Sequence, residues 1–370
     1  MANMRCFRWR GRYRGSVIVF AAVLCLLLWI ELEYTQNIST RKKHNGGIGR
    51  SVDKDVTDTK LSKRRRLRVL IHARMRTGST LTASYFADNP DFFYVYEPGH
   101  MIIEYKEMDL YKDGFDYLEP TRHELVDFIH SFLHCNFTGR DYFFKSINKN
   151  NFQRYYSNIT HLDLPVREAD VTAICLSKRH IVTKVIRLSN ILFASAVLKE
   201  DHVKVIHLVR DPRGMANSRR PFQGLSKISN GGEQFRFPDK LEQVIKDYCS
   251  WLDTNYLTVK NSDSWFKENV MFVRYEDLAD WPEEIVPKMY NFVGLQDSTH
   301  IRRLIKLSAK LRGNGQAWRS QLNLKEVKRI EDLCPDEVFR TFGYVKVHDE
   351  RQLRNKSVSL VKPVTDVASI

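Results

Sequence analysis

Short apolar runs separated by longer stretches of helical character occupy the chain between residues 67 and 344. Five of these runs are predicted to be strands, at residues 67–73, 92–96, 181–185, 203–209 and 270–275. Helices are predicted to begin at residues 80–87 and 215–220, and to cover residues 241–260 and 283–293. Strands separated by helices are typical of a parallel sheet, so residues 67–344 are expected to form one α/β domain.

The first part of the chain has a different pattern. Residues 17–30 are uninterruptedly apolar, five arginines precede them, and Glu31 and Glu33 follow. The run is shorter than the roughly 20 residues of an average membrane span, but thinner secretory membranes and snorkelling arginines accommodate it. Because no small-residue cleavage site follows, a signal anchor at residues 15–30 is favoured over a cleaved secretory signal. The basic residues then place residues 1–14 in the cytosol and the rest of the chain in the lumen.

Two polar stretches flank the predicted domain. Residues 31–66 lack apolar periodicity and are interpreted as a flexible luminal stem. Residues 345–370 have the same character, which predicts a loosely held C-terminal tail.

A luminal location also affects the cysteines and the asparagines. Four cysteines would meet an oxidising compartment, and the sequence leaves their three pairings open; they are Cys135, Cys175, Cys249 and Cys334. Four N-x-S/T tripeptides are candidate glycosylation sites, at Asn37, Asn136, Asn158 and Asn355.

The net charge narrows the range of functions. The chain has 370 residues, and its 59 Lys and Arg against 44 Asp and Glu give a net charge of +15. Residues 1–68 contain 16 of these basic residues and 5 of the acidic ones, so the rest of the chain is almost neutral. This distribution is unlike a nucleic-acid-binding domain, and any anion site in the folded part must be local.

The first candidate anion site is the loop between the predicted strand 67–73 and the helix that follows. A helix amino terminus offers unpaired N–H groups and the positive end of the dipole, Gly78 permits close approach, and Arg76 adds a cation. The predicted binding residues are Arg74, Met75, Arg76, Thr77, Gly78, Ser79 and Thr80. The loop lacks the lysine of a nucleoside-triphosphate loop, and an ordinary basic turn is the alternative.

The second candidate site also joins a strand to a helix. Arg210 ends the strand 203–209, and Ser218 lies about two helical turns later, within reach of an anion held by Arg210. The predicted binding residues are Leu208, Val209, Arg210, Asp211, Pro212, Arg213, Gly214, Met215, Ala216 and Ser218. A surface Arg–Asp pair is the alternative. Two such sites on adjoining strand ends would suit an adenosine with anionic groups at both ends.

These loops resemble the donor-binding motifs of the Golgi carbohydrate sulfotransferases, in the family of galactose, N-acetylglucosamine and N-acetylgalactosamine 6-O-sulfotransferases. Residues 76–80 (RTGST) resemble its 5′-phosphosulfate loop, R-x-G-S-[ST], and residues 208–218 (LVRDPRGMANS) resemble its 3′-phosphate motif. Further similarities follow in the family's order, at residues 89–98 (NPDFFYVYEP), 274–278 (RYEDL), Trp318-Arg319, Cys334 and Gly343-Tyr344.

The resemblance implies a fold, a donor and an acceptor. The fold would be the three-layer sulfotransferase fold, which is similar to that of P-loop nucleotide kinases, behind the single transmembrane helix of a type II Golgi membrane protein. The donor would be 3′-phosphoadenosine 5′-phosphosulfate (PAPS), and the acceptor a 6-hydroxyl of one of the three sugars in a glycan or glycosaminoglycan. Residues 76–80 would hold the phosphosulfate, with Arg76 stabilising charge on the bridging oxygen, and Arg210 with Ser218 would hold the 3′-phosphate. This chemistry requires no metal.

The acceptor hydroxyl needs a base, for which Glu97 is the candidate. It ends the strand 92–96, and burial among neighbouring aromatic side chains is expected to raise the pKa of its carboxyl. His100 is the rival base, although the motif here, Glu-Pro-Gly-His, is one residue shorter than in the family. Lys184 and Arg187 either line the acceptor cleft or are ordinary surface residues. Residues 312–319 are a candidate mobile lid, with an ordinary turn as the alternative.

Two other classes of protein fit parts of the pattern. A secretory-pathway nucleotide kinase would use the same strand–loop–helix arrangement, and a membrane protein that binds glycans without catalysis would need only the basic clusters. The missing lysine of the nucleoside-triphosphate loop is evidence against the kinase. The identity of the acceptor sugar and the oligomeric state do not follow from the sequence.

Overall fold

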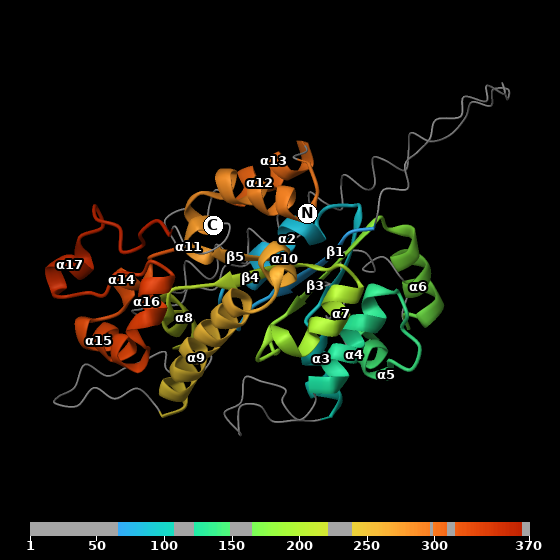
Figure 1. Ribbon diagram of the computed structural model, residues 1–370, viewed down its shortest axis with the longest axis horizontal. Coiled ribbons are helices and arrows are strands. Elements are labelled where there is room, and N and C mark those ends of the chain that lie inside the picture. Colours follow the sequence, from blue (N-terminus) through green and yellow to red (C-terminus); the bar gives the residue numbers. More distant parts are fainter. Residues whose placement is uncertain are drawn as a thin grey trace, which may run out of the picture. The chain divides into compact units, whose positions relative to one another are not determined.

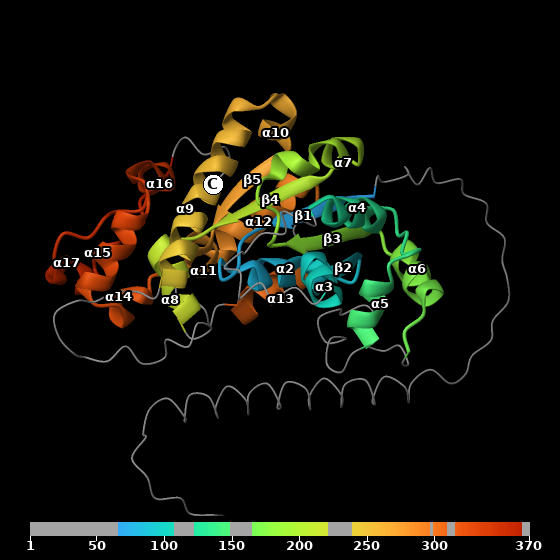
Figure 2. The ribbon, with the colours of Figure 1, turned by 90° about the horizontal axis from the view of Figure 1, so that it is seen from below.

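One parallel sheet lies at the centre of the computed structural model (Figure 1). The structure describes residues 66–106, 122–148, 165–220, 239–296, 299–308 and 315–364, all within the compact unit Arg64–Ile370. Within these ranges the strands are β1 (Arg68–His72), β2 (Phe92–Tyr96), β3 (His180–Val185), β4 (Lys204–Val209) and β5 (Val270–Arg274). Their order across the sheet is β2-β3-β1-β4-β5, which can be followed in Figure 2. All five predicted strands are confirmed, each to within one residue at either end.

Helices connect the strands. They are α2 (Ser79–Ala87), α3 (Pro98–Tyr105), α4 (Arg122–Leu133), α5 (Asp141–Asn148), α6 (Glu168–Ser177), α7 (Ser195–Glu200), α8 (Pro212–Arg219), α9 (Asp239–Asn261), α10 (Ser264–Asn269), α11 (Tyr275–Asp280), α12 (Pro282–Val293), α13 (Thr299–Ser308), α14 (Trp318–Gln321), α15 (Leu324–Leu333), α16 (Asp336–Thr341) and α17 (Glu350–Arg354). Helix α8 begins three residues before its predicted start because Pro212 occupies the first turn, where a missing N–H costs no hydrogen bond.

Two apolar cores separate the protein into three layers. Successive side chains of a strand point to opposite faces, so Val69 and Ile71 of β1 pack on one side of the sheet and Leu70 on the other. The first core includes residues of α2, α12 and α13, and the second includes residues of α4, α9 and α15. Figure 1 shows α12 and α13 on one side of the strands and α4, α7 and α9 on the other. The α/β three-layer arrangement is therefore confirmed.

The register of the sheet decides where the two candidate loops meet. Strands β1 and β4 are hydrogen-bonded neighbours, and His72 at the end of β1 lies opposite His207 of β4. Because the strands are parallel, the loops that follow them leave the same edge of the sheet. Open α/β sheets bind ligands at this carboxyl edge.

The expectation of a loosely held segment from Val345 is wrong for residues 345–364. Val347, Leu353 and Leu360 are fully buried, and Tyr344 forms an isolated antiparallel bridge with Val361. The guanidinium of Arg319 donates hydrogen bonds to the carbonyl oxygens of Gln352, Leu353, Asn355 and Val358. A single buried arginine thus satisfies backbone carbonyl groups of a segment that has little regular secondary structure. The sequence pattern does not reveal that this segment packs around Arg319.

The structure selects one of the three cysteine pairings. Disulfides join Cys135 to Cys175 and Cys249 to Cys334, with Cα–Cα distances of 5.7 and 5.4 Å. The first links the turn after α4 to α6, and the second links α9 to the end of α15.

Within the described ranges, no helix combines the length and the apolar character needed to cross a bilayer. The predicted anchor at 15–30 and the cytoplasmic tail at 1–14 lie outside the described residues, as does the stem at 31–66 except for Arg66. All three remain predictions.

Candidate active site

The loop between β1 and α2 forms a tight turn with an uncapped helix start. Thr77 closes the turn, because its hydroxyl donates to the carbonyl oxygen of Arg74 over 2.7 Å and accepts from the Arg74 amide over 3.3 Å. Gly78 precedes the helix with φ +93°, and as the N-cap residue it has no side chain to cap α2. A Cβ at Gly78 would lie 2.2 Å from Cδ2 of Tyr275, so only glycine fits. The start of α2 therefore offers an anion N–H groups that its N-cap residue does not occupy.

The side chains of this loop have two different roles. Arg76 and Thr80 are exposed, whereas Ser79 and Thr77 are buried. Arg74 points into the protein, where its guanidinium donates to the carbonyl oxygen of Ile186 over 3.3 Å and lies 6.0 Å from the Trp251 ring. Met75 packs against the core beneath α2. Of the predicted residues, Arg76 and Thr80 thus present their side chains at the surface, while Arg74 supports the loop from behind.

Arg76 contacts Arg210 and Ser218, the two residues of the second loop that were predicted to hold the 3′-phosphate. Nε of Arg76 donates to the hydroxyl of Ser218 over 2.9 Å, and Nη1 of Arg210 donates to the carbonyl oxygen of Arg76 over 2.9 Å. Partial burial and then the charges of Arg210 and Arg219 lower the pKa of Arg76. The two loops therefore form one positively charged site, and an anion bound there would relieve the repulsion between its arginines.

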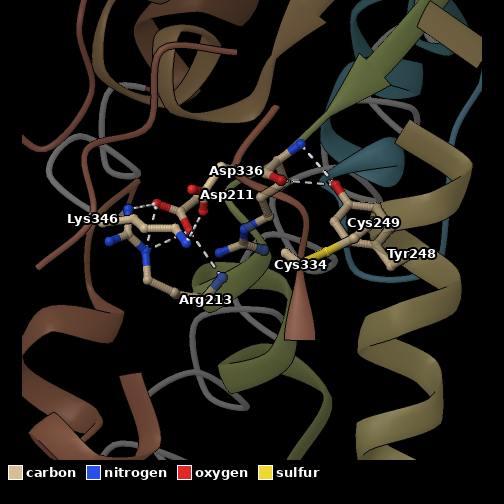
Figure 3. Close-up of a disulfide and its surroundings, with 8 residues drawn as sticks. Asp211, Arg213, Tyr248, Cys249, Cys334, Asp336 and Lys346 are labelled. Atoms are coloured by element: carbon tan, nitrogen blue, oxygen red, sulfur yellow. Dashed lines mark hydrogen bonds and ion pairs between the residues drawn. A yellow bond between two sulfur atoms is a disulfide. The ribbon is translucent and has the colours of Figure 1, made fainter. Parts of the chain in front are cut away.

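Arg210 is held in place by aromatic residues of two helices, α11 and α9. Its guanidinium carbon lies 4.1 Å from the centre of the Tyr275 ring in α11. The hydroxyl of Tyr248 in α9 accepts from the Arg210 amide over 2.9 Å and donates to the Arg210 carbonyl oxygen over 2.8 Å. Burial raises the pKa of Tyr248 well above its ordinary value, so this hydroxyl stays a donor at all physiological pH values. Figure 3 shows Tyr248 beside the Cys249–Cys334 disulfide, which anchors this part of α9.

The rest of the second loop is buried and supports the site from below. Asp211 caps α8 by accepting from the Arg213 amide over 2.8 Å, and its carboxylate lies 2.7 Å from Nη2 of Arg213 (Figure 3). Arg213 also pairs with Glu331 at 2.8 Å and donates to the carbonyl oxygen of Val345. Six other predicted residues are buried or closely packed in the same region; they are Leu208, Val209, Pro212, Gly214, Met215 and Ala216. Side-chain contact with a ligand is thus left to Arg210 and Ser218.

The motif at residues 274–278 braces this loop. Tyr275 lies under Arg210, and Arg274 pairs with Asp277 at 2.6 Å while donating to the carbonyl oxygens of Phe342 and Lys362. Glu276 accepts from the Asp211 amide over 3.1 Å and from the Tyr344 hydroxyl over 3.1 Å. Burial, and then the charge of Asp211, raises the pKa of the Glu276 carboxyl to about 7.

Replacing Glu276 by glutamine should stabilise the protein at neutral and alkaline pH but not near pH 4.5. A carboxyl whose pKa rises on folding stabilises the folded state while it is protonated, so wild-type stability falls as pH rises from 4.5 to about 7. Glutamine resembles the protonated acid, so the variant should exceed wild type by roughly 3 kcal/mol in free energy of unfolding at pH 8 and by almost nothing near pH 4.5. Urea unfolding at both pH values measures this, with E350Q, at an exposed position of α17, as the control. An equal difference at both pH values would contradict the prediction.

Glu97 lies at the same edge of the sheet, at the end of β2. Its carboxylate is 2.8 Å from Nζ of Lys184 and 3.1 Å from Nη1 of Arg187, and it is nearly buried. Burial alone would raise the pKa of Glu97, but the charges of Lys184 and Arg187 outweigh it and lower the pKa. The expectation of a raised pKa is therefore wrong, because the sequence does not show that Lys184 of β3 and Arg187, just after that strand, lie beside this carboxylate.

Lys184 connects Glu97 to the first loop. Its side chain is fully buried, and Nζ donates to the hydroxyl of Thr80 over 3.3 Å as well as contacting Glu97. Nζ also lies 3.9 Å from the centre of the Tyr96 ring. Burial lowers the pKa of Lys184 although Glu97 opposes the shift. An anion bound near Thr80 would therefore compete with Glu97 for this lysine.

His100 is close enough to act on Glu97. Its amide donates to the Glu97 carbonyl oxygen over 2.9 Å, and its imidazole contributes to the lowered pKa of Glu97. Both candidate bases thus occupy one end of the site, next to the loop at residues 76–80.

The late loop differs from the expected lid in its described part. Trp318 and Arg319 are buried, with Arg213 lying 4.2 Å from the Trp318 ring. They hold the C-terminal segment to α8 and are unsuited to a mobile lid. Residues 312–314 of the expected lid lie outside the described residues.

Comparisons with known proteins agree with this geometry. The family model described as "Sulfotransferase domain" matches residues 68–321, which include both loops, Glu97 and Lys184. Carbohydrate sulfotransferase 1 of Mus musculus is 24% identical over 412 residues, which cover 92% of this chain and 97% of that protein. Carbohydrate sulfotransferase 3 of Tetronarce californica is 24% identical over 346 residues, which cover 80% of this chain and 77% of that protein.

Solved structures are similar at lower sequence identity. A mouse sulfotransferase, SULT7A1 complexed with PAP, matches with a TM-score of 0.40 at 13% identity, covering 79% of this chain and 86% of that one. The assignment therefore rests on the sequence matches, and above all on the family model, which spans well over half of the chain. The chain belongs to the sulfotransferase family, in which it groups with the carbohydrate sulfotransferases.

Proposed function

We propose that this protein is a Golgi membrane enzyme that transfers the sulfuryl group of PAPS to the 6-hydroxyl of galactose, N-acetylglucosamine or N-acetylgalactosamine in a glycan or glycosaminoglycan. The observation that carries the donor assignment is the contact of Arg76 with both Ser218 and Arg210. A 3′-phosphate and a 5′-phosphosulfate are close together on one ribose, so a single molecule would satisfy both loops. A nucleoside triphosphate has no second anionic group for Arg210 and Ser218.

The reaction is an in-line displacement at sulfur. The acceptor hydroxyl oxygen forms a bond to the sulfur as the bond from sulfur to the bridging phosphate oxygen breaks, and the electron pair stays on that oxygen. Adenosine 3′,5′-bisphosphate leaves, and the hydroxyl proton passes to the base, Glu97 or His100. The first N–H groups of α2, together with Arg76, stabilise the charge that grows on the bridging oxygen.

Donor binding also prepares Glu97. The phosphosulfate beside Thr80 attracts Lys184, which in the free protein is shared between Thr80 and Glu97. As Lys184 moves toward the donor, Glu97 loses one of the two cations that lower its pKa, and its carboxylate becomes more basic. The base is therefore strongest when a sulfuryl group is in place.

The proposed location depends on the amino-terminal pattern of residues 1–33, which predicts a type II anchor. Two features of the described residues are consistent with a luminal domain. Both disulfides suit an oxidising compartment, and the sequon asparagines Asn136 and Asn355 are exposed.

Two measurements on the purified full-length chain test the proposal. Adenosine 3′,5′-bisphosphate should raise the melting temperature and ATP with Mg²⁺ should not, while radiolabelled sulfate from PAPS should be transferred to at least one glycan in a desulfated panel. The reverse thermal ranking would favour a kinase. Binding without transfer to any sugar would reject the carbohydrate acceptor, and no response to either nucleotide would favour a glycan-binding protein.

A further inference from the structure

A second group of ligand-type side chains lies apart from the candidate active site. His130 is in α4, His134 follows the end of that helix, and Asp201 follows α7. The two histidines are four residues apart and share one helical face, with ring centres 4.8 Å apart. One donor atom from each of the three residues lies within 4.8 Å of the others.

This cluster is at the opposite edge of the sheet from the donor loops. Asp201 lies three residues before β4, at the amino end of that strand. Arg68, the first residue of β1, contacts it through a hydrogen bond of 3.4 Å to the Asp201 carbonyl oxygen and a contact of 3.9 Å between Nε and Oδ1. Arg76, Arg210 and Glu97 follow the carboxyl ends of their strands, at the other edge. The proposed sulfuryl transfer therefore does not use the cluster of His130, His134 and Asp201.

The Asp201 carboxylate is incompletely satisfied. Oδ1 lies 2.8 Å from Nε2 of His134, but Oδ2 is buried and has no hydrogen-bond partner among the described residues. The residue as a whole is only 4% exposed. A buried carboxylate oxygen without a partner is costly, and native proteins usually satisfy such an atom with a donor, a water or a metal ion.

We propose that His130, His134 and Asp201 bind a zinc ion. Two imidazoles and one carboxylate form a ligand set that Zn²⁺ prefers, with water completing the tetrahedron. Donor atoms about 2.1 Å from a tetrahedral zinc are about 3.4 Å apart, so small side-chain rotations would close the present spacing. The ion would cross-link α4 to the α7–β4 connection beside the Cys135–Cys175 disulfide, and its role would be structural.

An adjoining cavity gives the ion a route to this position. The cavity has a volume of about 370 Å³ and is lined by His130, together with His123, Asp127, Arg122 and Glu200. Asp127 and Glu200 add carboxylates to the cavity wall, and Asp127 also pairs with Arg140 at 2.6 Å. The cavity also has room for the water that would occupy the fourth coordination position.

Equilibrium dialysis of the chelator-treated full-length chain against Zn²⁺ tests the proposal. Wild type should bind one zinc per chain at micromolar or lower concentration, and H130A and D201N should each weaken that binding at least tenfold. H123A is the matched control, because His123 is in the same helix and lines the same cavity but is not one of the three ligands; its affinity should equal that of wild type. Co²⁺ in place of Zn²⁺ should give the visible absorption of a tetrahedral site, which H130A should abolish.

Stability and activity separate this inference from the proposed function. Zinc at a hundredfold excess over its Kd should raise the Tm by about 5 °C in wild type and H123A, and not in H130A. Sulfuryl transfer should survive chelation at a temperature well below the Tm, whether or not a sugar acceptor has been found. Absence of zinc binding up to 100 μM, on the order of a hundredfold above the expected Kd, or equal binding by H130A and wild type, would overturn the proposal.

Discussion

Replacing Arg210 by alanine is expected to weaken binding of adenosine 3′,5′-bisphosphate by at least about 100-fold, with little change in Tm. An arginine can make two charge-assisted hydrogen bonds to one phosphate, and each is worth about 1.5–3 kcal/mol. The guanidinium also donates to the carbonyl oxygen of Arg76, so its loss releases the first loop as well. The backbone of Arg210 would remain in place, because Tyr248 holds its amide and carbonyl groups. Isothermal titration calorimetry with the bisphosphate measures the effect.

Three further variants test which feature of the second loop binds the bisphosphate. R210K keeps the charge without the planar fork and should fall between wild type and R210A. S218A removes one hydroxyl contact and should cost about tenfold. R351A removes an exposed arginine in α17, far along the chain from either loop, and should bind the bisphosphate like wild type. Unchanged affinity in R210A would mean that the second loop does not hold the donor.

The meeting of the two loops was predictable in part, because parallel strands direct the loops that follow them to one edge of the sheet. Apolar runs identify β1 and β4, and once both strands are parallel neighbours the arginines that follow them must emerge at one edge. The positions of Glu97, Lys184 and Arg187 depend on the register between β2 and β3, in which Tyr96 lies opposite Lys184. No local pattern encodes that register, so the sequence could suggest Glu97 as a base but gave its pKa shift the wrong direction.

Residues that support the site from a distance were also beyond sequence reasoning. Tyr248 is one of several aromatic residues in an amphipathic helix, and only the tertiary structure shows that its hydroxyl binds Arg210. Arg319 resembles a surface arginine until the C-terminal segment packs around it. The spacing of His130 and His134 was a usable signal for a metal site. The third member, Asp201, lies 67 residues after His134, and only the tertiary structure brings it to the two histidines.

Glu97→Gln is expected to lower kcat by about 1,000-fold while the Kd for adenosine 3′,5′-bisphosphate changes by less than about threefold, because general-base removal typically costs 10²- to 10⁴-fold. Glutamine keeps the size of the side chain and a carbonyl oxygen for Lys184, so the loop at Thr80 should stay in place. If Glu97 were only a structural partner of Lys184 and Arg187, the variant would instead lose Tm and donor affinity together and keep its turnover once saturated. H100Q is the parallel test of the rival base, and the variant with the larger fall in kcat at unchanged donor affinity identifies the base.

The pH dependence of kcat/KM gives an independent answer in the wild-type enzyme. Lys184 and Arg187 lower the pKa of Glu97 below its ordinary value of 4.5, so its ion pairs stabilise the fold above that pH and are lost only as pH falls through the lower value. The value of kcat/KM for PAPS reports the enzyme without bound donor. A Glu97 base therefore predicts that this kcat/KM stays constant from neutral pH down to about 5. An imidazole base would make kcat/KM fall tenfold for each pH unit below about 6.5. Replacing Lys184 by methionine removes the nearer cation, and with Glu97 as the base it should move the acid decrease of kcat/KM to higher pH. With His100 as the base, no such upward shift is expected.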